Sequence, residues 1–141
     1  TTDRLKEMYG QIGGTERGRY LLNIIEKSPD LFVLGYLPGY EAETLFNQIH
    51  EGRPATIISV NPDSSPLGPI KTDGSSKMCE AMPTPPVIVL AHEIGHAADG
   101  NPFGANDPLP EIRRMYEIGN IQQNENPIRR ELGLPERLPP Y

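Results

Sequence analysis

The sequence is poor in cysteine, in basic charge and in long hydrophobic runs, and each shortage excludes a class of protein. Cys79 is the only cysteine among 141 residues, so neither a disulfide scaffold nor a cysteine-based zinc finger can form. No apolar run approaches the roughly 18 residues of a membrane-spanning helix. Residues 1–10 carry charges and no hydrophobic stretch, so no signal peptide is visible. Because no initiating methionine is present, we expect a processed chain or an excised piece of a longer protein.

The charge balance argues against nucleic acid as a partner. Nineteen acidic residues against thirteen basic ones give a net charge of −6, and no lysine or arginine stripe is available to follow a phosphate backbone. A chain of this length can bury one core, so we expect a single domain over residues 1–141. Its 16 prolines and 14 glycines predict short elements joined by long loops.

Hydrophobic periodicity and turn residues predict an α+β chain. The spacing of Leu5, Met8 and Ile12 predicts the first helix, and alternating β-formers predict the strands. The predicted elements are helices over 1–12, 15–28, 40–50, 87–100 and 109–118, a last helix from about residue 127 to before residue 133, strands over 31–37 and 55–60, and a ribbon with residues 69–72 as one arm.

The motif His92-Glu93-Ile94-Gly95-His96 carries the strongest chemical signal. Residues four apart lie on one face of a helix, so both imidazoles can reach one metal ion at about 2.0–2.1 Å. Glu93 then lies beside the open coordination position, where a carboxylate can take a proton from a metal-bound water. The motif therefore predicts a hydrolytic Zn²⁺ site with His92 and His96 as ligands and Glu93 as the general base.

The same helix also has a purely structural interpretation, in which backbone or carboxylate groups satisfy two buried histidines. Gly95 inside the helix costs roughly 1 kcal/mol relative to alanine. Close approach of another element, which we expect to be a strand, would explain that cost.

Zinc needs a third protein ligand, and residue spacing leaves its identity open. His50 is far upstream, and Pro102 stands where the third histidine of a metzincin would be. Asp99, only three residues after His96, fits an orienting or capping role better. The remaining solution is a glutamate from a separate downstream helix. The candidate acids downstream are Asp99, Asp107, Glu111, Glu117, Glu125 and Glu131.

HEIGHA, followed about thirty residues later by ENPIRRELGLPER at residues 125–137, resembles a family of bacterial effector metallopeptidases related to NleD. That family includes peptidase domains at the C-terminal ends of Rhs-type and other polymorphic toxins. The resemblance covers the zinc helix and the last seventeen residues, while the N-terminal half contributes only its helix-then-strand order. HEIGHA alone would also suit the ImmA/IrrE regulatory peptidases, and the ENPIRRELGLP segment separates the two groups.

The resemblance implies that Glu125 is the third ligand, with Glu117 as the alternative. Cys79 could mask the metal in a latent form, although an inert thiol is the simpler interpretation. Arginines and tyrosines could donate to the oxyanion or to the substrate, although solvated charges and core packing explain them equally simply. These candidate donors are Arg129, Arg130, Tyr36, Tyr40 and Tyr116.

Motif and resemblance together predict a zinc-dependent endopeptidase on a compact zincin-like α+β fold, with a small sheet packed on the HExxH helix. The resemblance implies a secreted or delivered effector or toxin that acts as a monomer on a protein in a host or competitor cell. A cognate immunity protein would accompany the toxin version. Two alternatives are a regulatory peptidase inside its own cell and a non-catalytic zinc or protein-binding module, although an intact Glu93 argues against the second.

Overall fold

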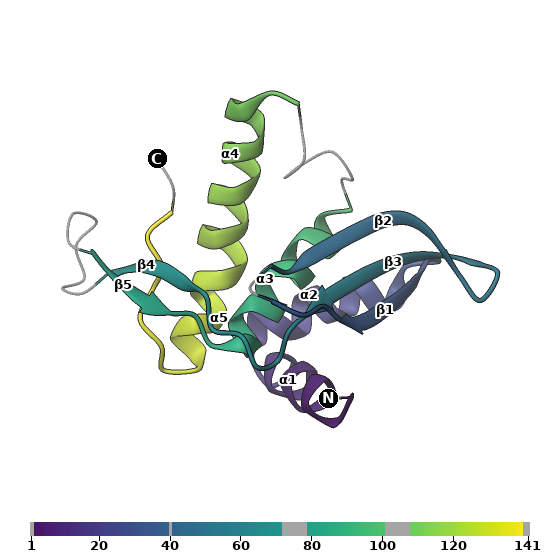
Figure 1. The fold of residues 1–141 in the computed structure, drawn as a ribbon, viewed down its shortest axis with the longest axis horizontal. Helices are drawn as coiled ribbons and strands as arrows, with labels where there is room; N and C mark the ends of the chain where they lie inside the picture. Colours follow the sequence, from purple (N-terminus) through teal and green to yellow (C-terminus); the bar gives the residue numbers. More distant parts are fainter. Residues whose placement is uncertain (1, 40, 72–78, 101–107, 140–141) are drawn as a thin grey trace.

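A computed structural model describes residues 2–39, 41–71, 79–100 and 108–139, and these form a mixed α+β fold, as predicted (Figure 1). The elements in chain order are α1 (Thr2–Gly13), α2 (Glu16–Lys27), β1 (Leu31–Tyr36), β2 (Glu43–His50), β3 (Arg53–Val60), β4 (Leu67–Lys71), β5 (Cys79–Pro83), α3 (Pro86–Asp99), α4 (Pro110–Asn120), the π-helical turn η1 (Ile121–Glu125) and α5 (Asn126–Glu131). No helix in the described ranges is both long and apolar enough to cross a membrane.

Two separate β-structures flank the motif helix. The first is a three-stranded sheet in the order β1-β3-β2, in which β1 is parallel and β2 antiparallel to β3. The central strand β3 carries the buried residues Ala55, Ile58 and Val60. The second is the predicted ribbon, in which β4 pairs antiparallel with β5.

Helix α3 is the centre of the core. It contacts α1 and α2, strands β2 and β3 of the sheet, and all three segments from α4 to α5. Ile88, Leu90 and Ile94 are fully buried, and each side chain of this size contributes about 1.5–3 kcal/mol of burial free energy. The helix begins with Pro86 at its first turn and ends at Gly100, whose φ of 72° is left-handed. The sheet therefore packs on the motif helix, as the sequence predicts.

The predicted helix over residues 40–50 is wrong, because Glu43–His50 form β2. A β-bulge between Leu45 and Gln48 adds one residue to β2 relative to β3, and Asn47 takes a positive φ of 57° there. Because the bulge adds a residue to this strand, Leu45, Phe46 and Ile49 do not alternate as in a regular strand. Their spacing in the sequence therefore also fits a helix. Two of these three, Leu45 and Ile49, are solvent-exposed.

The last predicted helix does not start at Pro127, because the chain is already helical from Pro110 through Glu131. A proline inside an α-helix lacks an N–H and its ring clashes with the carbonyl four residues earlier. The preceding turn is π-helical instead, and the Asn126 N–H bonds the carbonyl of Ile121, five residues back. This wider turn accommodates Pro127 without ending the helix.

Candidate metal centre

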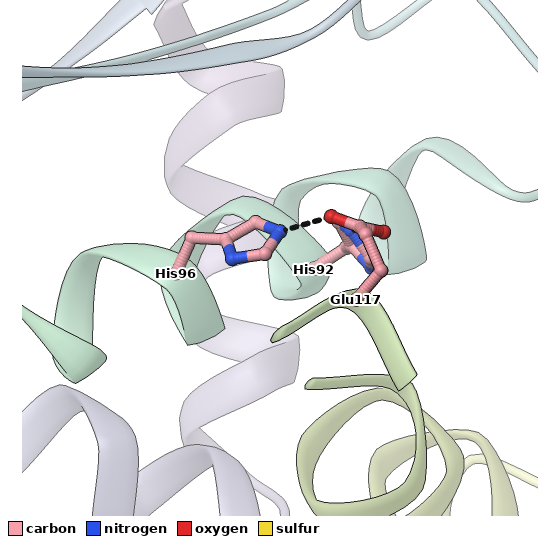
Figure 2. A group of neighbouring side chains, drawn as sticks. All are labelled: His92, His96 and Glu117. Atoms are coloured by element: carbon pink, nitrogen blue, oxygen red, sulfur yellow. Dashed lines mark hydrogen bonds and ion pairs between the residues drawn. The ribbon is translucent and has the colours of Figure 1, made fainter. Parts of the chain in front are cut away.

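Three side chains from α3 and α4 form a group that could bind a metal ion: His92, His96 and Glu117. The Nε2 atom of His96 lies 2.7 Å from Glu117 Oε1, and the Nε2 atom of His92 lies 3.2 Å from Glu117 Oε2. One possible ligand atom from each residue lies within 4.8 Å of the others. Figure 2 shows both imidazoles extending from α3 toward this carboxylate. Two imidazoles and a carboxylate are the donor set of many catalytic zinc sites.

Glu125 lies behind His92, on the opposite side of the imidazole ring from Glu117. Its Oε1 atom is 2.9 Å from His92 Nδ1, and the residue is fully buried. An ionised carboxylate only accepts hydrogen bonds, so in the metal-free chain both nitrogens of His92 carry a proton, Nδ1 toward Glu125 and Nε2 toward Glu117. A metal ion bound at Nε2 would replace only the second of these protons. Carboxylates that orient metal-binding histidines in this way are common in metalloproteins. The group that could bind a metal ion therefore contains Glu117, whereas Glu125, which the resemblance implied as the third ligand, lies against Nδ1 of His92.

The histidines and glutamates perturb each other's protonation in the metal-free chain. Burial by itself lowers the pKa of His92, but hydrogen bonds and charge interactions with Glu117 and Glu125 outweigh it and raise that pKa to about 9. Burial raises the pKa of Glu125, yet His92 and two arginines outweigh it and lower that pKa to about 2. Glu117 is shifted downward likewise, because its hydrogen bonds to His92 and His96 outweigh desolvation of its carboxyl. Both carboxylates are therefore ionised at neutral pH.

The π-turn brings both glutamates to the same face of the long helix. Eight residues make about 2.2 turns of a regular α-helix, which would rotate Glu125 about 80° away from Glu117. A π-helical turn holds more residues, so η1 reduces this offset. As a result, Glu117 faces the Nε2 atom of His92 and Glu125 faces its Nδ1 atom.

Two arginines hold Glu125 in place. Arg129 Nε donates to Glu125 Oε2 at 2.8 Å, and Arg137 Nη1 donates to Oε1 at 3.2 Å. The Asn126 side chain bonds both the N–H and the carbonyl of Arg137, which fixes the C-terminal segment beside the helix. That segment also pairs with β4, because Ile70 forms a β-bridge with Arg137. Residues of the ENPIRRELGLPER segment thus build the surroundings of His92.

The close approach that Gly95 permits involves a side chain of a helix, and not the strand that the sequence suggested. A Cβ atom on Gly95 would lie 2.0 Å from Oδ1 of Asn120. The Asn120 side chain packs against α3 at this point, and its Nδ2 atom donates to the carbonyl of His92 at 2.9 Å. Asn124 in turn donates to Asn120 at 2.8 Å. Gly95 therefore lets the acid-bearing helix approach the histidines closely.

Glu93, the predicted general base, is buried and faces the sheet. The Thr44 hydroxyl of β2 lies 3.0 Å from Glu93 Oε1 and 3.1 Å from its carbonyl. Glu93 and His92 both line a cavity of about 150 Å³ between α3 and the β4–β5 ribbon. A second cavity of about 360 Å³ lies beside His96 and is also lined by Tyr116.

The remaining predicted residues lie in several places. Arg129 is 1% exposed and bonds Glu125, so it is not a solvated charge and does not face a substrate. Arg130 is exposed and pairs with Glu136. Cys79 begins β5. Tyr36, Glu111 and Asp99 are exposed, His50 ends β2, and Glu131 accepts from the first N–H groups of α2. Tyr40 and Asp107 lie outside the described residues.

Sequence reasoning gave no role to two residues near the site, Thr44 and Arg137. Thr44 lies on a strand that the sequence suggested was a helix, so no signal pointed to it. Arg137 had a signal, because it belongs to the segment that carries the family resemblance. Its role became visible only once the C-terminal segment was placed beside Glu125.

Comparison of the chain with models of known protein families, with curated protein sequences and with solved structures gives no significant match.

Proposed function

We propose that this protein is a zinc-dependent endopeptidase on a zincin-like fold. The observation that carries the proposal is the convergence of the two Nε2 atoms and the Glu117 carboxylate, with Glu93 next to His92 in the same helix. Zinc fits this donor set because it accepts nitrogen and oxygen ligands in a tetrahedral arrangement with one position left for water. Glu125 further supports the proposal, because its bond to Nδ1 leaves Nε2 of His92 free for a metal.

Each residue then has a defined task. A bound zinc ion supplies Lewis acidity, which acidifies a water molecule and polarises the scissile carbonyl. Glu93 accepts the proton of the attacking water and passes it to the leaving amine. Thr44 holds the Glu93 carboxylate at 3.0 Å and links it to the sheet. Glu125 keeps the His92 ring in one orientation through Nδ1.

Strand β2 is suited to hold a peptide beside this site. Within the described residues it pairs only with β3, so its outer edge has backbone groups available for an added strand. Thr44 places this strand next to Glu93. An extended substrate lying along β2 would therefore pass the general base.

We propose further that the chain is a bacterial effector or toxin peptidase related to NleD, acting on a protein of a target cell. The support is the ENPIRRELGLPER segment, whose side chains Glu125, Arg129 and Arg137 form one hydrogen-bonded group behind His92. In a toxin of this kind, an immunity protein would cover the cleft. Expression inside bacterial and eukaryotic cells tests this part of the proposal. Growth should fail in at least one host with the wild type and continue with Glu93→Gln, and normal growth with both proteins in all hosts would contradict it.

Elemental analysis of purified protein never exposed to chelator tests the metal. We expect one zinc per chain, together with proteolysis of unfolded test proteins that a chelator stops and added zinc restores. Protein that contains no transition metal and binds none on titration would contradict the proposed function.

A further inference from the structure

The cavity beside Glu93 contains an arginine with a free hydrogen-bond donor. Arg137 reaches this 150 Å³ cavity from the C-terminal segment. Its Nη1 atom is bound to Glu125, but its Nε atom is buried and has no hydrogen-bond partner among the described residues. A buried donor on a charged group is costly when it is left unpaired. A ligand that accepts a hydrogen bond at this point would remove that cost.

Gly68 keeps the space beside this donor open. It is buried on β4 and lines the same cavity, and its φ lies outside the left-handed range, so the backbone there does not require glycine. A Cβ at this position would lie 3.3 Å from Thr84 Oγ1 and 3.9 Å from Arg137 Nε. Any larger side chain would fill the space next to the free donor.

Arg137 lines the cavity together with the carboxylates of Glu93 and Glu125, so what matters is which charges are already paired. Glu125 is shared between two guanidinium groups, Arg129 and Arg137, so one carboxylate faces two positive charges. Glu93 adds a negative charge to the cavity, but its carboxylate is bound to Thr44 of β2, whereas Arg137 lies next to Gly68 of β4. A divalent ion held by two neutral histidines and Glu117 would add one net positive charge beside the cavity.

We propose that Arg137 is a specificity residue, and that this pocket binds a carboxylate of the substrate next to the scissile bond. This inference rests on the proposed peptidase function. A guanidinium matches a carboxylate in both charge and geometry, and the free Nε atom provides the donor. The carboxylate could come from an aspartate or glutamate side chain or from the C-terminus of a peptide. Both sources present the same group to Arg137.

Binding of metal-directed peptides tests the pocket without requiring turnover. Short peptide hydroxamates, which attach to zinc, would carry either aspartate or asparagine at each position in turn, and a free or amidated C-terminus. Calorimetry on the zinc-loaded chain should show that one carboxylate form binds roughly 10- to 100-fold more tightly than its amide, as expected for a charge-assisted hydrogen bond. A preference at a side-chain position identifies an acidic residue, and a preference for the free terminus identifies the chain end. Equal affinities for acid and amide at every position would overturn the inference.

Substitutions then assign the preference to Arg137. Arg137→Gln should reduce the acid-to-amide ratio to about one, and Arg137→Lys should restore part of it. Gly68→Val should also abolish the ratio while leaving Arg137 and its bond to Glu125 in place. Arg130→Gln, which removes an exposed positive charge from the neighbouring helix, serves as the control and should leave the ratio unchanged.

Zinc content and melting temperature, measured for every variant, separate the possible failures. A protein that takes up no zinc, and therefore binds no hydroxamate, would refute the proposed function together with this inference. A zinc-loaded Arg137→Gln protein that keeps the wild-type ratio would refute the inference alone.

Discussion

Replacing Glu117 and Glu125 separately by alanine should weaken metal binding and folding in different proportions. Glu117 faces both Nε2 atoms and its side chain is 30% exposed, whereas Glu125 faces Nδ1 of His92 and its side chain is 1% exposed. If Glu117 is a ligand and Glu125 orients a ligand, the first substitution should mainly remove zinc. The second should mainly destabilise the fold.

The expected magnitudes follow from the contacts. Zinc sites with four protein ligands bind with about 10–16 kcal/mol, or roughly 3–4 kcal/mol per ligand, so losing Glu117 should weaken binding roughly 100- to 1,000-fold. Loss of an orienting carboxylate typically costs about 10- to 100-fold, which is the range expected for Glu125→Ala. That variant also leaves Arg129 buried without its partner, and breaking a buried ion pair costs about 3–5 kcal/mol. At about 2–4 °C per kcal/mol, the metal-free protein should melt roughly 10 °C lower.

Competition with a chelator gives the zinc affinities, and thermal melting of the metal-free chain gives the stabilities. Glu111→Ala is the matched control, because it removes an exposed acid from the first turn of the same helix and should change neither quantity. If Glu125→Ala loses zinc more severely than Glu117→Ala while its metal-free form stays stable, the ligand assignment is reversed and the reasoning fails.

Three further expectations concern the same helix pair. Glu93→Gln should abolish peptide hydrolysis but keep zinc content and melting temperature within error, because a general base is not a ligand; turnover comparable to wild type would exclude that role. The pKa of His92 is raised from 6.5 to about 9, so its stabilising effect on the metal-free chain is fully present below about pH 6.5 and is lost as the pH rises through about 9. Melting temperatures measured as a function of pH should record this loss, and the loss should be smaller in Glu117→Gln. An equal pH dependence of the melting temperature in both proteins would contradict the role of Glu117 in raising the pKa of His92. Gly95→Ala places a methyl group 2.0 Å from Asn120 Oδ1, so it should lower the free energy of unfolding by about 1–3 kcal/mol and weaken zinc binding. Urea denaturation that shows an unchanged stability would exclude a tight contact between Gly95 and Asn120.

Elements with regular periodicity could be predicted from the sequence, and elements with an inserted residue could not. Helices α1, α2 and α3 and strand β3 follow the predicted ranges closely because their apolar spacing is uninterrupted. The two errors, β2 and the start of the last helix, both lie at an irregularity. A β-bulge disturbs the strand pattern, and a π-turn carries the helix through Pro127. Local propensity does not specify either, since tertiary packing decides where an extra residue is accommodated.

The candidate site divides in the same way. His92 and His96 lie four residues apart on one helix, so the sequence alone was sufficient to predict that these two side chains lie together. The third position depends on how a second helix is rotated about its axis, and a π-turn changes that rotation between Glu117 and Glu125. No count of residues along the chain could rank the two acids. Packing of Asn120 against Gly95 then decides how close the second helix comes.

The hydrogen bonds of Glu125 connect the C-terminal segment to the candidate metal site. Glu125 receives hydrogen bonds from His92, Arg129 and Arg137, so its carboxylate connects α3, α5 and the C-terminal segment. The C-terminal segment is itself fixed to β4, because the Lys71 N–H donates to the Glu136 carbonyl and the Leu138 N–H donates to the Pro69 carbonyl. Displacing the segment would withdraw Arg137 from Glu125 and loosen the orientation of the His92 ring. The position of the C-terminal segment and the geometry of the first histidine are therefore mechanically coupled, although the two are separated by more than thirty residues in sequence.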